Sequence, residues 1–290
     1  MQPLLFGVNV STSAAPGADP VREARAAEDL GFDFVSSSDH PSGTHPTFET
    51  WTMLTWIAAS TSRIQVLSRV LSIPFRSPAL VAKMAESLDR LSGGRLILGL
   101  GAGATDAELH GFGLPVPPVK EKIDGLADAI HIIRGLWNET SYSYDGSEYH
   151  TNSGEMTPKP ERSIPIWTGT FGDRALAITG RQADGWIPTL GYAPLDQLPV
   201  MRHKVLAAAQ AAGRSPDDVT CALNVTVSVD GTGEPNPDIL AGSPGEIAER
   251  LGELAAIGFT AFNFMLEGPK PESQLERLAS AVLPALRTAS

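Results

Sequence analysis

The run SSSDHP places an aspartate and a histidine together at positions 39 and 40, directly after a short apolar segment. A histidine side chain can give or take a proton near neutral pH, so His40 is a candidate catalytic acid or base. Asp39 could orient the ring of His40, or it could face a cofactor instead. The plainer alternative is that both side chains only cap the loop with hydrogen bonds.

A glycine-rich run, GLGAGA, occupies residues 99–104 and formally fits the pattern GxGxxG/A. A Rossmann dinucleotide site would need this pattern on the first strand-to-helix turn, with an acidic residue about 20 residues further on. Here three strand–helix units precede the run, and a helical segment follows at that distance. Gly101 and Gly103 therefore either let a cofactor approach the backbone or make a tight turn. Glu108 follows closely and is either a second acid or base or a surface glutamate.

A third candidate segment is the loop of small residues in WTGTFGD, formed by Thr168, Gly169, Thr170, Phe171 and Gly172. It opens a predicted helix, and the first N–H groups of a helix have no partner within the helix. Such a helix start suits a phosphate group. Together with the glycine-rich run, this loop predicts a phosphorylated ring cofactor.

Short apolar runs alternate with longer helical segments along the whole chain. The expected strands cover residues 4–10, 32–37, 64–71, 95–100, 164–168, 184–189, 219–229 and 259–266. The expected helices cover residues 19–30, 48–60, 78–91, 119–137, 173–182, 195–212, 244–257 and 272–286. This pattern predicts a parallel (β/α)8 barrel that forms a single domain over residues 1–290. An open doubly wound sheet has the same local units, but eight units without a dividing linker favour closure.

In a (β/α)8 barrel, catalytic residues stand at the carboxyl-terminal ends of the strands and in the loops that follow them. The three candidate segments each follow a predicted strand, so we expect them to meet at that end of the barrel. Extra length at residues 101–118 and 138–163 predicts loop insertions on the same face, the second of them carrying a small β-hairpin over residues 141–151.

Composition narrows the classes of partner. The 290 residues include 22 basic and 33 acidic residues, a net charge of −11, which is no footprint for nucleic acid or an anionic membrane. No stretch approaches the length of apolar residues that spans a bilayer, and the first residues do not have the pattern of a secretion signal. With one cysteine, no HExxH motif and no third histidine near His40 and His45, we expect no metal site. These features predict a soluble, cytoplasmic protein with a small-molecule substrate.

Three longer runs carry a resemblance: TSRIQV, AKMAESLDRLSGGRLILGLGAG and KPERSIPIWTGTFGDRALAITGRQADGWIP. In this order and spacing they resemble the luciferase-like flavin and deazaflavin oxidoreductases, and the likeness covers residues 4–190. SLDRLSGGR and RQADGWIP are the most specific parts. The resemblance implies a (β/α)8 barrel that binds FMN or the deazaflavin coenzyme F420 at its carboxyl-terminal end. We also expect a homodimer.

Within this family, an Asp-His pair after the second strand is similar to that of the deazaflavin-using branch. The resemblance implies that His40 gives or takes a proton near C5 of the cofactor, and that Asp39 lies against the cofactor. It also implies that Ser72 and Ile73 form the bulge that supports the deazaflavin ring, often through a non-prolyl cis peptide. Glu108 falls near the glutamate that many deazaflavin members place beside the substrate.

The resemblance further implies that the backbone of Gly101, Ala102 and Gly103 and the loop 168–172 hold the ribityl chain and the phosphate. Many relatives carry an aromatic residue after the glycines and an arginine ahead of the next helix. Here those places hold Ala104 and a lysine, which leaves the details of the phosphate contacts open.

Three functions follow as hypotheses. The first is an F420-dependent oxidoreductase that moves a hydride between C5 of the deazaflavin and a small organic substrate. The second is an FMN-dependent monooxygenase of the same fold. The third is a barrel without catalytic activity that only binds flavin or a partner.

Overall fold

The computed structural model describes residues 3–103, 105–231, 236–268 and 270–289. Its parallel strands are β1 (Leu5–Asn9), β2 (Phe34–Ser37), β3 (Gln65–Ser68), β4 (Leu71–Ser72), β5 (Leu96–Gly101), β8 (Ile166–Thr168), β9 (Gly185–Trp186), β10 (Thr220–Val229), β11 (Ile239–Gly242) and β12 (Ala261–Leu266). Within the described residues, eight of these pair in a closed ring, in the order β1-β2-β3-β5-β8-β9-β10-β12 and back to β1. The predicted (β/α)8 barrel is therefore confirmed.

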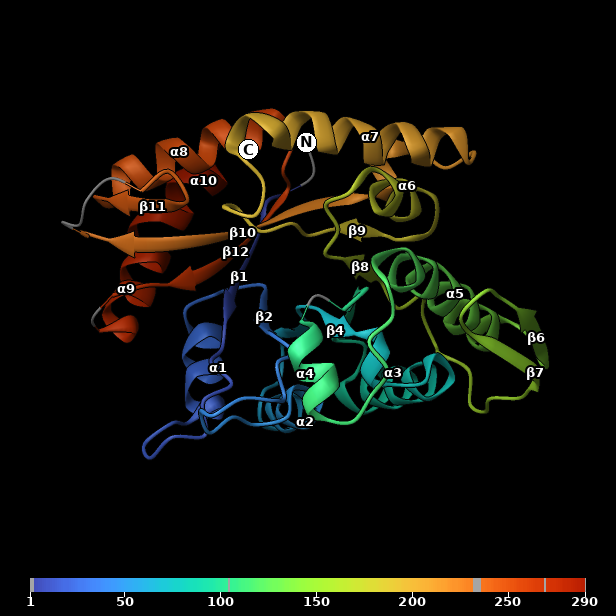
Figure 1. The fold of residues 1–290 in the computed structure, drawn as a ribbon. Coiled ribbons are helices and arrows are strands. Elements are labelled where there is room, and N and C mark those ends of the chain that lie inside the picture. Colours follow the sequence, from blue (N-terminus) through green and yellow to red (C-terminus); the bar gives the residue numbers. More distant parts are fainter. Residues whose placement is uncertain (1–2, 104, 232–235, 269, 290) are drawn as a thin grey trace.

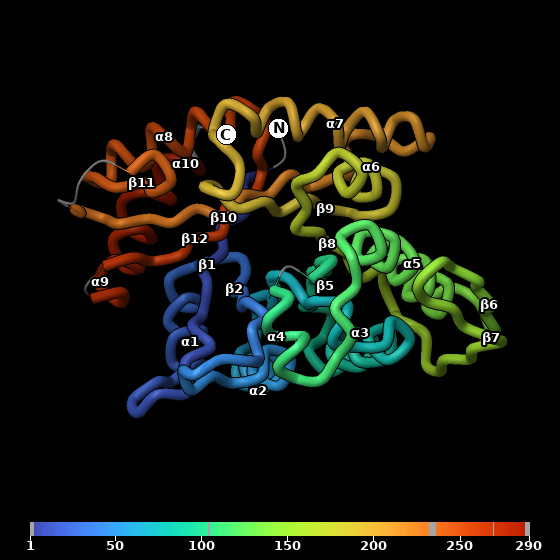
Figure 2. Tube along the Cα trace, viewed as in Figure 1, coloured from blue at the N-terminus to red at the C-terminus, as the bar shows by residue number. Residues whose placement is uncertain are grey.

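Helices surround this ring on the outside (Figure 1). They are α1 (Pro20–Asp29), α2 (Thr50–Ser60), α3 (Pro78–Ser92), α4 (Asp106–Gly111), α5 (Val119–Asn138), α6 (Asp173–Gln182), α7 (Leu198–Ala211), α8 (Pro244–Ile257), α9 (Pro271–Arg277) and α10 (Leu283–Ala289). Figure 2 shows the chain winding once around the barrel, so that its first and last strands lie side by side, as the β1–β12 pairing requires. None of the described helices is long and apolar enough to cross a membrane.

Local signals explain where several helices begin and end. The Asp19 side chain accepts the Arg22 N–H at 3.0 Å and so caps the start of α1. Gly93 ends α3 in the left-handed region, with φ of 73°. Ser243 and Glu246 form a reciprocal capping box at the start of α8. The predicted bounds of α8, 244–257, match the structure for this reason, and those of α6, 173–182, match as well.

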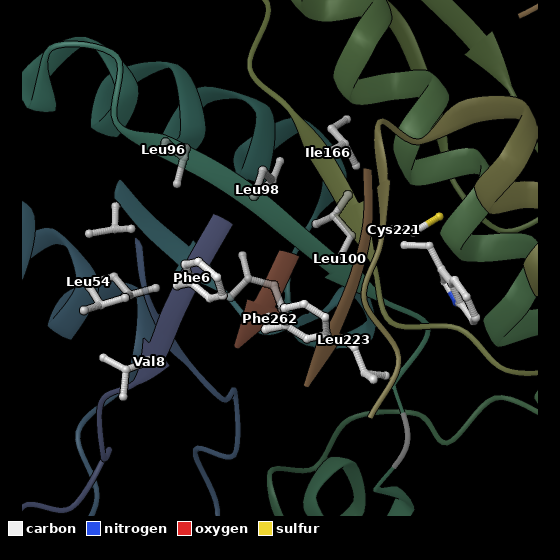
Figure 3. Packing of buried hydrophobic residues seen from close by; sticks show 14 of the residues in the cluster. Phe6, Val8, Leu54, Leu96, Leu98, Leu100, Ile166, Cys221, Leu223 and Phe262 are labelled. Carbon is white, nitrogen blue, oxygen red and sulfur yellow. The ribbon is translucent and has the colours of Figure 1, made fainter. Parts of the chain in front are cut away.

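Side chains of the strands alternate between two apolar layers. Figure 3 shows the outer layer, where Phe6, Val8 and Leu98 pack beneath the surrounding helices. The inner layer fills the barrel itself and consists of Phe34, Leu67, Ile97, Trp167, Ile187, Ala222 and Ala261. Such a filled interior is the packed core of a (β/α)8 barrel, and it leaves the carboxyl-terminal end, here called the mouth, for function.

A neutral polar layer lies farther along the strands than the inner apolar layer. The Ser36 hydroxyl donates to Asn263 Oδ1 at 2.9 Å, and Asn263 Nδ2 donates to Asn224 Oδ1 at 2.9 Å. Asn224 Nδ2 continues the chain to the Thr189 hydroxyl at 3.1 Å. Because each of these buried groups has a hydrogen-bond partner, the layer forms a rigid floor beneath the mouth.

The structure departs from the predicted elements where long-range pairing decides. The predicted strand 64–71 breaks into β3 and β4, with a non-prolyl cis peptide between Arg69 and Val70. The structure therefore places the non-prolyl cis peptide three residues before Ser72–Ile73, where Leu71 and Ser72 pair with β5 as β4. A run of apolar residue types does not reveal such a break.

Other differences concern elements added to the ring. Strand β11 pairs with the end of β10, and the short helix α4 follows β5; the sequence predicted neither. The hairpin of β6 (Tyr142–Asp145) and β7 (His150–Gly154) connects α5 to β8, and Figure 1 shows it beside α5. A helix-to-strand connection lies at the amino-terminal end of a barrel, so placing the 138–163 insertion on the catalytic face was wrong.

Candidate active site

His40 and Glu108 meet at the mouth, although 68 residues separate them in the chain. His40 follows β2, and Glu108 belongs to α4 in the insertion after β5. His40 Nδ1 lies 3.1 Å from Glu108 Oε1 and 3.3 Å from Oε2. Since an ionised carboxylate only accepts hydrogen bonds, Nδ1 donates to it. The His40 side chain is 57% exposed, whereas that of Glu108 is 13% exposed.

This contact resembles the base–orienter pair of many enzymes. Glu108 fixes the tautomer of His40 and leaves Nε2 as the nitrogen that can exchange a proton. Among the described residues, Nε2 of His40 has no hydrogen-bond partner. The structure thus brings together the two residues that the sequence names as catalytic candidates, and it exposes the nitrogen that such chemistry needs.

The Asp39 side chain is buried and is bonded to Arg76 and Ser72, not to His40. Its carboxylate accepts two hydrogen bonds from Arg76, at 2.7 and 2.9 Å, and one from the Ser72 N–H at 2.9 Å. Arg76 also donates to Glu49 at 2.7 Å. Burial lowers the pKa of Arg76, but its hydrogen bonds to Asp39 and Glu49 outweigh this and raise the pKa overall. Asp39 therefore ties the end of β2 to β4 and to the loop before α3.

The glycines of the GLGAGA run have a packing reason. A Cβ at Gly99 would lie 1.7 Å from the Ser68 carbonyl oxygen, and one at Gly101 would lie 2.5 Å from Val70 Cγ2. Gly103 has φ of 89°, and a Cβ there would lie 2.9 Å from the Ser72 hydroxyl. The segment between β3 and α3 thus packs directly against β5, and the Val70 side chain covers Gly101. Ala104 lies outside the described residues.

The loop 168–172 is tightly tied to the barrel. The Thr168 and Thr170 hydroxyls each lie 2.7 Å from the Thr179 hydroxyl inside α6, and both threonines are buried. The carbonyl of Thr170 accepts a hydrogen bond from the Trp186 indole at 2.9 Å. The threonine side chains are therefore used internally, and the backbone of the loop is what remains for a ligand.

Phe171 and Gly172 form the open part of this loop. Phe171 packs against Tyr192 with ring centroids 5.7 Å apart. Gly172 is the residue before α6, and a Cβ built there would meet nothing within 4 Å. Space is therefore open at Gly172, directly before the first turn of α6, and the N–H groups of a helix start suit an anion.

A charged network ties neighbouring elements to this face. Lys122, at the start of α5, pairs with Asp106 of α4, and Asp124 pairs with both Lys120 and Arg174. These contacts fix α4, and therefore Glu108, relative to α5 and α6. No group of three or more His, Cys, Asp or Glu side chains within the described residues could hold a metal ion.

One residue of the mouth, Arg69, escaped prediction from the sequence. It stands between β3 and β4, where its Nη2 donates to Asn9 Oδ1 at 2.9 Å. The sequence contains a usable signal, since an arginine interrupts the apolar run VLSRVLSI at the end of a predicted strand. A charged side chain in such a run is expected at a strand end that opens into a site.

A cavity of about 280 Å³ lies at the opposite end of the barrel, where α6 ends and β9 begins. Two of the arginines that line it serve the fold. Arg134 donates to the Gln182 carbonyl and to Asp184, and Arg214 donates to the carbonyls of Gly180 and Ala183. Because these side chains satisfy the carbonyls at the end of α6, this cavity is a helix-capping site and not a candidate active site.

Comparison with known proteins adds independent findings. The sequence profile of the luciferase-like monooxygenases matches residues 4–235. An F420-dependent glucose-6-phosphate dehydrogenase of Kineococcus radiotolerans is 30% identical over 241 residues, which are 79% of this chain and 69% of that protein. The corresponding protein of Microbacterium testaceum is 32% identical over 237 residues, which are 78% of this chain and 68% of that protein.

Solved structures are similar in fold at lower identity. An F420-dependent secondary alcohol dehydrogenase, solved with an F420-acetone adduct, matches with a TM-score of 0.87 and 18% identity, over 98% of this chain and 99% of that one. The coenzyme F420-dependent tetrahydromethanopterin reductase of Methanopyrus kandleri matches with a TM-score of 0.83 and 21% identity, over the same shares. The monooxygenase RslO1 of Streptomyces bottropensis matches with a TM-score of 0.81 and 20% identity, over 97% of this chain and 99% of that one.

Proposed function

The chain belongs to the luciferase-like monooxygenase family, and from this premise we propose that it is an F420-dependent oxidoreductase acting on a small organic substrate. The relatives at 30–32% identity are F420-dependent dehydrogenases, which supports a deazaflavin as the redox partner. The contact between His40 and Glu108 carries the proposal. It supplies one oriented proton-transfer group at the end of the barrel where this fold carries its chemistry.

Several features of the mouth fit the cofactor. The open space before Gly172 suits a phosphate at the first turn of α6, and the Val70 side chain over Gly101 offers an apolar support for a flat ring. We assign the phosphate to the backbone of Phe171 and Gly172, and the ribityl chain to the backbone of Ala102 and Gly103. When bound, the deazaflavin supplies hydride transfer at C5.

The other residues implied by the family resemblance take supporting roles in this proposal. Asp39 and Ser72 hold the bulge in place through their hydrogen bond, and the buried Ile73 packs behind it. Thr168, Gly169 and Thr170 form the rigid base of the phosphate loop. These residues position the surfaces that contact the cofactor.

His40 is the proposed proton donor or acceptor for the substrate. Hydride transfer to or from an oxygen-bearing carbon changes the proton affinity of that oxygen, so a group that can give or take a proton must lie within reach. Nε2 of His40 has no hydrogen-bond partner among the described residues, and the Glu108 carboxylate orients the ring by accepting the Nδ1 hydrogen bond.

The substrate would stand between apolar walls. Phe75 and Phe112 pack edge to face with centroids 6.0 Å apart, and Phe171 with Tyr192 forms a second aromatic pair. Phe112 and Tyr192 are more than half exposed. Exposed aromatic side chains on the loops that follow the barrel strands suit an organic alcohol or carbonyl compound. We also propose that the protein acts in the cytoplasm as a homodimer.

Cofactor choice is the first test. We expect F420 to bind with a dissociation constant of about 1 μM or lower, and FMN and NADPH to bind more weakly. Fluorescence titration of the purified protein with each cofactor measures this directly. A protein purified yellow with one equivalent of FMN, and indifferent to F420, would support the alternative of an FMN-dependent monooxygenase. Binding without any hydride exchange would support a barrel that has no catalytic activity.

Gly172→Val tests the phosphate loop. The backbone of Gly172 has φ of −74° and ψ of 150°, which valine adopts readily, so the variant should fold. Its side chain would fill the space before α6 and weaken F420 binding about tenfold or more, because charge-assisted hydrogen bonds to the phosphate are lost. Gly169→Val, whose Cβ would lie 3.4 Å from Val70 Cγ2, should weaken binding as well, because the added methyl groups crowd the loop.

Gly245→Val provides a matched control for this experiment. Gly245 stands in the first turn of α8, and a Cβ there also meets nothing within 4 Å. Unfolding midpoints of all three variants should be compared with the native protein. Unchanged F420 affinity in a folded Gly172→Val protein would limit the loop to a structural role.

A further inference from the structure

Arg69 places a guanidinium group at the floor of the mouth. Leu67 points into the barrel interior, and a residue two positions further along a strand shares its face. The Arg69 N–H donates to the Ser37 carbonyl at 2.7 Å, and its Nη2 donates to Asn9 Oδ1 at 2.9 Å. The side chain thus extends from the end of β3 toward the end of β1, over the top of the barrel.

Among the described residues, the Arg69 guanidinium has no counter-charge, since none of their carboxylates lies within ion-pair distance of it. Its Nε is buried and has no hydrogen-bond partner in the part of the chain that the structure describes. The polar floor that begins next to Asn9, with Ser36 and Asn263, is neutral. Burial lowers the pKa of Arg69 to about 10, which still leaves it charged at neutral pH.

Arg76, in the same loop, shows the contrast. It is also largely buried, but Asp39 and Glu49 satisfy it with three hydrogen bonds. A buried charge without a partner costs stability, whereas a paired one does not leave that cost uncompensated. The fold pairs Arg76 fully but supplies no anionic partner for Arg69. A bound anion would therefore stabilise the Arg69 guanidinium.

We propose that Arg69 binds an oxyanion, a carboxylate or phosphate group, of the molecule that occupies the mouth. The planar guanidinium matches such groups with paired N–H donors. The oxyanion can come from the substrate or from the cofactor's own acidic groups, and we favour the substrate because Arg69 is bonded to Ser37, three residues before His40. Held there, an acidic substrate would present its reacting carbon next to His40. This inference rests on the proposed function only for the identity of the reaction.

The test uses the protein without cofactor and two simple probes, inorganic phosphate and acetate. Calorimetric titration should detect binding of at least one probe to the native protein, and Arg69→Gln should weaken it about 10- to 100-fold, as expected for a lost charge-assisted pair. Arg69→Lys keeps the charge without the fork and should lie between the two. Arg250→Gln, which removes an exposed arginine of α8, should bind like the native protein.

Thermal unfolding without ligand distinguishes binding from a structural role. If Arg69 serves a ligand, Arg69→Gln removes an unpaired buried charge, so the unfolding midpoint should stay the same or rise. The stabilisation that phosphate or acetate confers on the native protein should vanish in this variant. A lowered midpoint with unchanged probe binding would overturn the proposal and leave Arg69 as a support for Asn9.

F420 titration of the same variants separates the two sources. Unchanged F420 affinity in Arg69→Gln, with probe binding lost, assigns the oxyanion to the substrate. A parallel tenfold loss of F420 affinity assigns it to the cofactor, and both results support an oxyanion site. If neither F420 nor either probe distinguishes Arg69→Gln from Arg250→Gln, the site does not exist. A native protein that ignores F420 would refute the proposed function, yet probe binding to the cofactor-free protein would still be measured independently.

Discussion

Replacing His40 with alanine should lower kcat about 10²- to 10⁴-fold while leaving F420 affinity nearly unchanged. The expected loss is that of a positioned acid or base, because Glu108 holds Nδ1 at 3.1 Å and leaves Nε2 for the substrate. Cofactor binding should persist, since within the described residues the exposed His40 side chain is hydrogen-bonded to Glu108 and not to the loop 168–172 or to Gly101–Gly103. Steady-state kinetics and F420 titration of the same preparation provide the two measurements.

Two further variants make this result specific. His40→Asn retains a hydrogen-bonding side chain but cannot give or take a proton, so its kcat should fall about as far as that of His40→Ala. Glu108→Gln keeps the shape of the pair but weakens the hydrogen bond that orients the His40 ring, so it should lower kcat by less than His40→Ala. A folded His40→Ala enzyme with near-native turnover would contradict the catalytic role of His40 and indicate that its side chain only caps the loop.

Asp39→Ala should destabilise the fold by about 3–5 kcal/mol, toward the lower end because Glu49 still pairs with Arg76. The Asp39 side chain is fully buried, and its removal leaves the Arg76 guanidinium and the Ser72 N–H without their main partner. Chemical denaturation measures the free energy of unfolding. F420 affinity should fall in parallel, because the bulge between β3 and α3 loses the contact that holds it against β5.

Two further variants test this prediction: Asp39→Asn is the conservative replacement, and Glu272→Ala is the surface control. Asparagine keeps an acceptor for the Ser72 N–H, so its F420 affinity should recover more than its stability. Glu272 pairs with Arg22 on the surface, where both side chains are more than half exposed, and its removal should cost less than about 1 kcal/mol. A loss in Asp39→Ala no larger than that of Glu272→Ala would show that the buried pair does not hold the bulge.

Many residues of the candidate site could be predicted from the sequence, because the carboxyl-terminal ends of the strands converge in this fold. His40 follows β2 and Glu108 follows β5, and closure of the ring brings the loops after those strands to one end. Their direct contact was not accessible, since it depends on α4, a short helix whose position is set by the Lys122–Asp106 pair to α5. Short helices without an apolar periodicity leave little trace in a sequence.

The glycine-rich run was easy to find in the sequence, but its glycines also have a packing reason that the sequence does not show. GLGAGA suggested close approach by a cofactor, and the structure shows that Gly99 and Gly101 make room for the Ser68 carbonyl and the Val70 side chain. The same backbone can still contact a ligand at Ala102 and Gly103. A motif of small residues indicates that another group approaches the backbone closely, but it does not identify that group.

By itself, the sequence determined the eight strand–helix units, their caps and the family. Each of these depends on neighbours a few residues apart, such as Asp19 with Arg22 or Ser243 with Glu246. Only the tertiary structure decided which charges face each other in the mouth. Asp39 lies 37 residues from Arg76, and Arg69 lies 60 residues from Asn9. Contacts of charged side chains over such separations follow from closure of the barrel and from the break between β3 and β4, and neither has a local energetic signature in the chain.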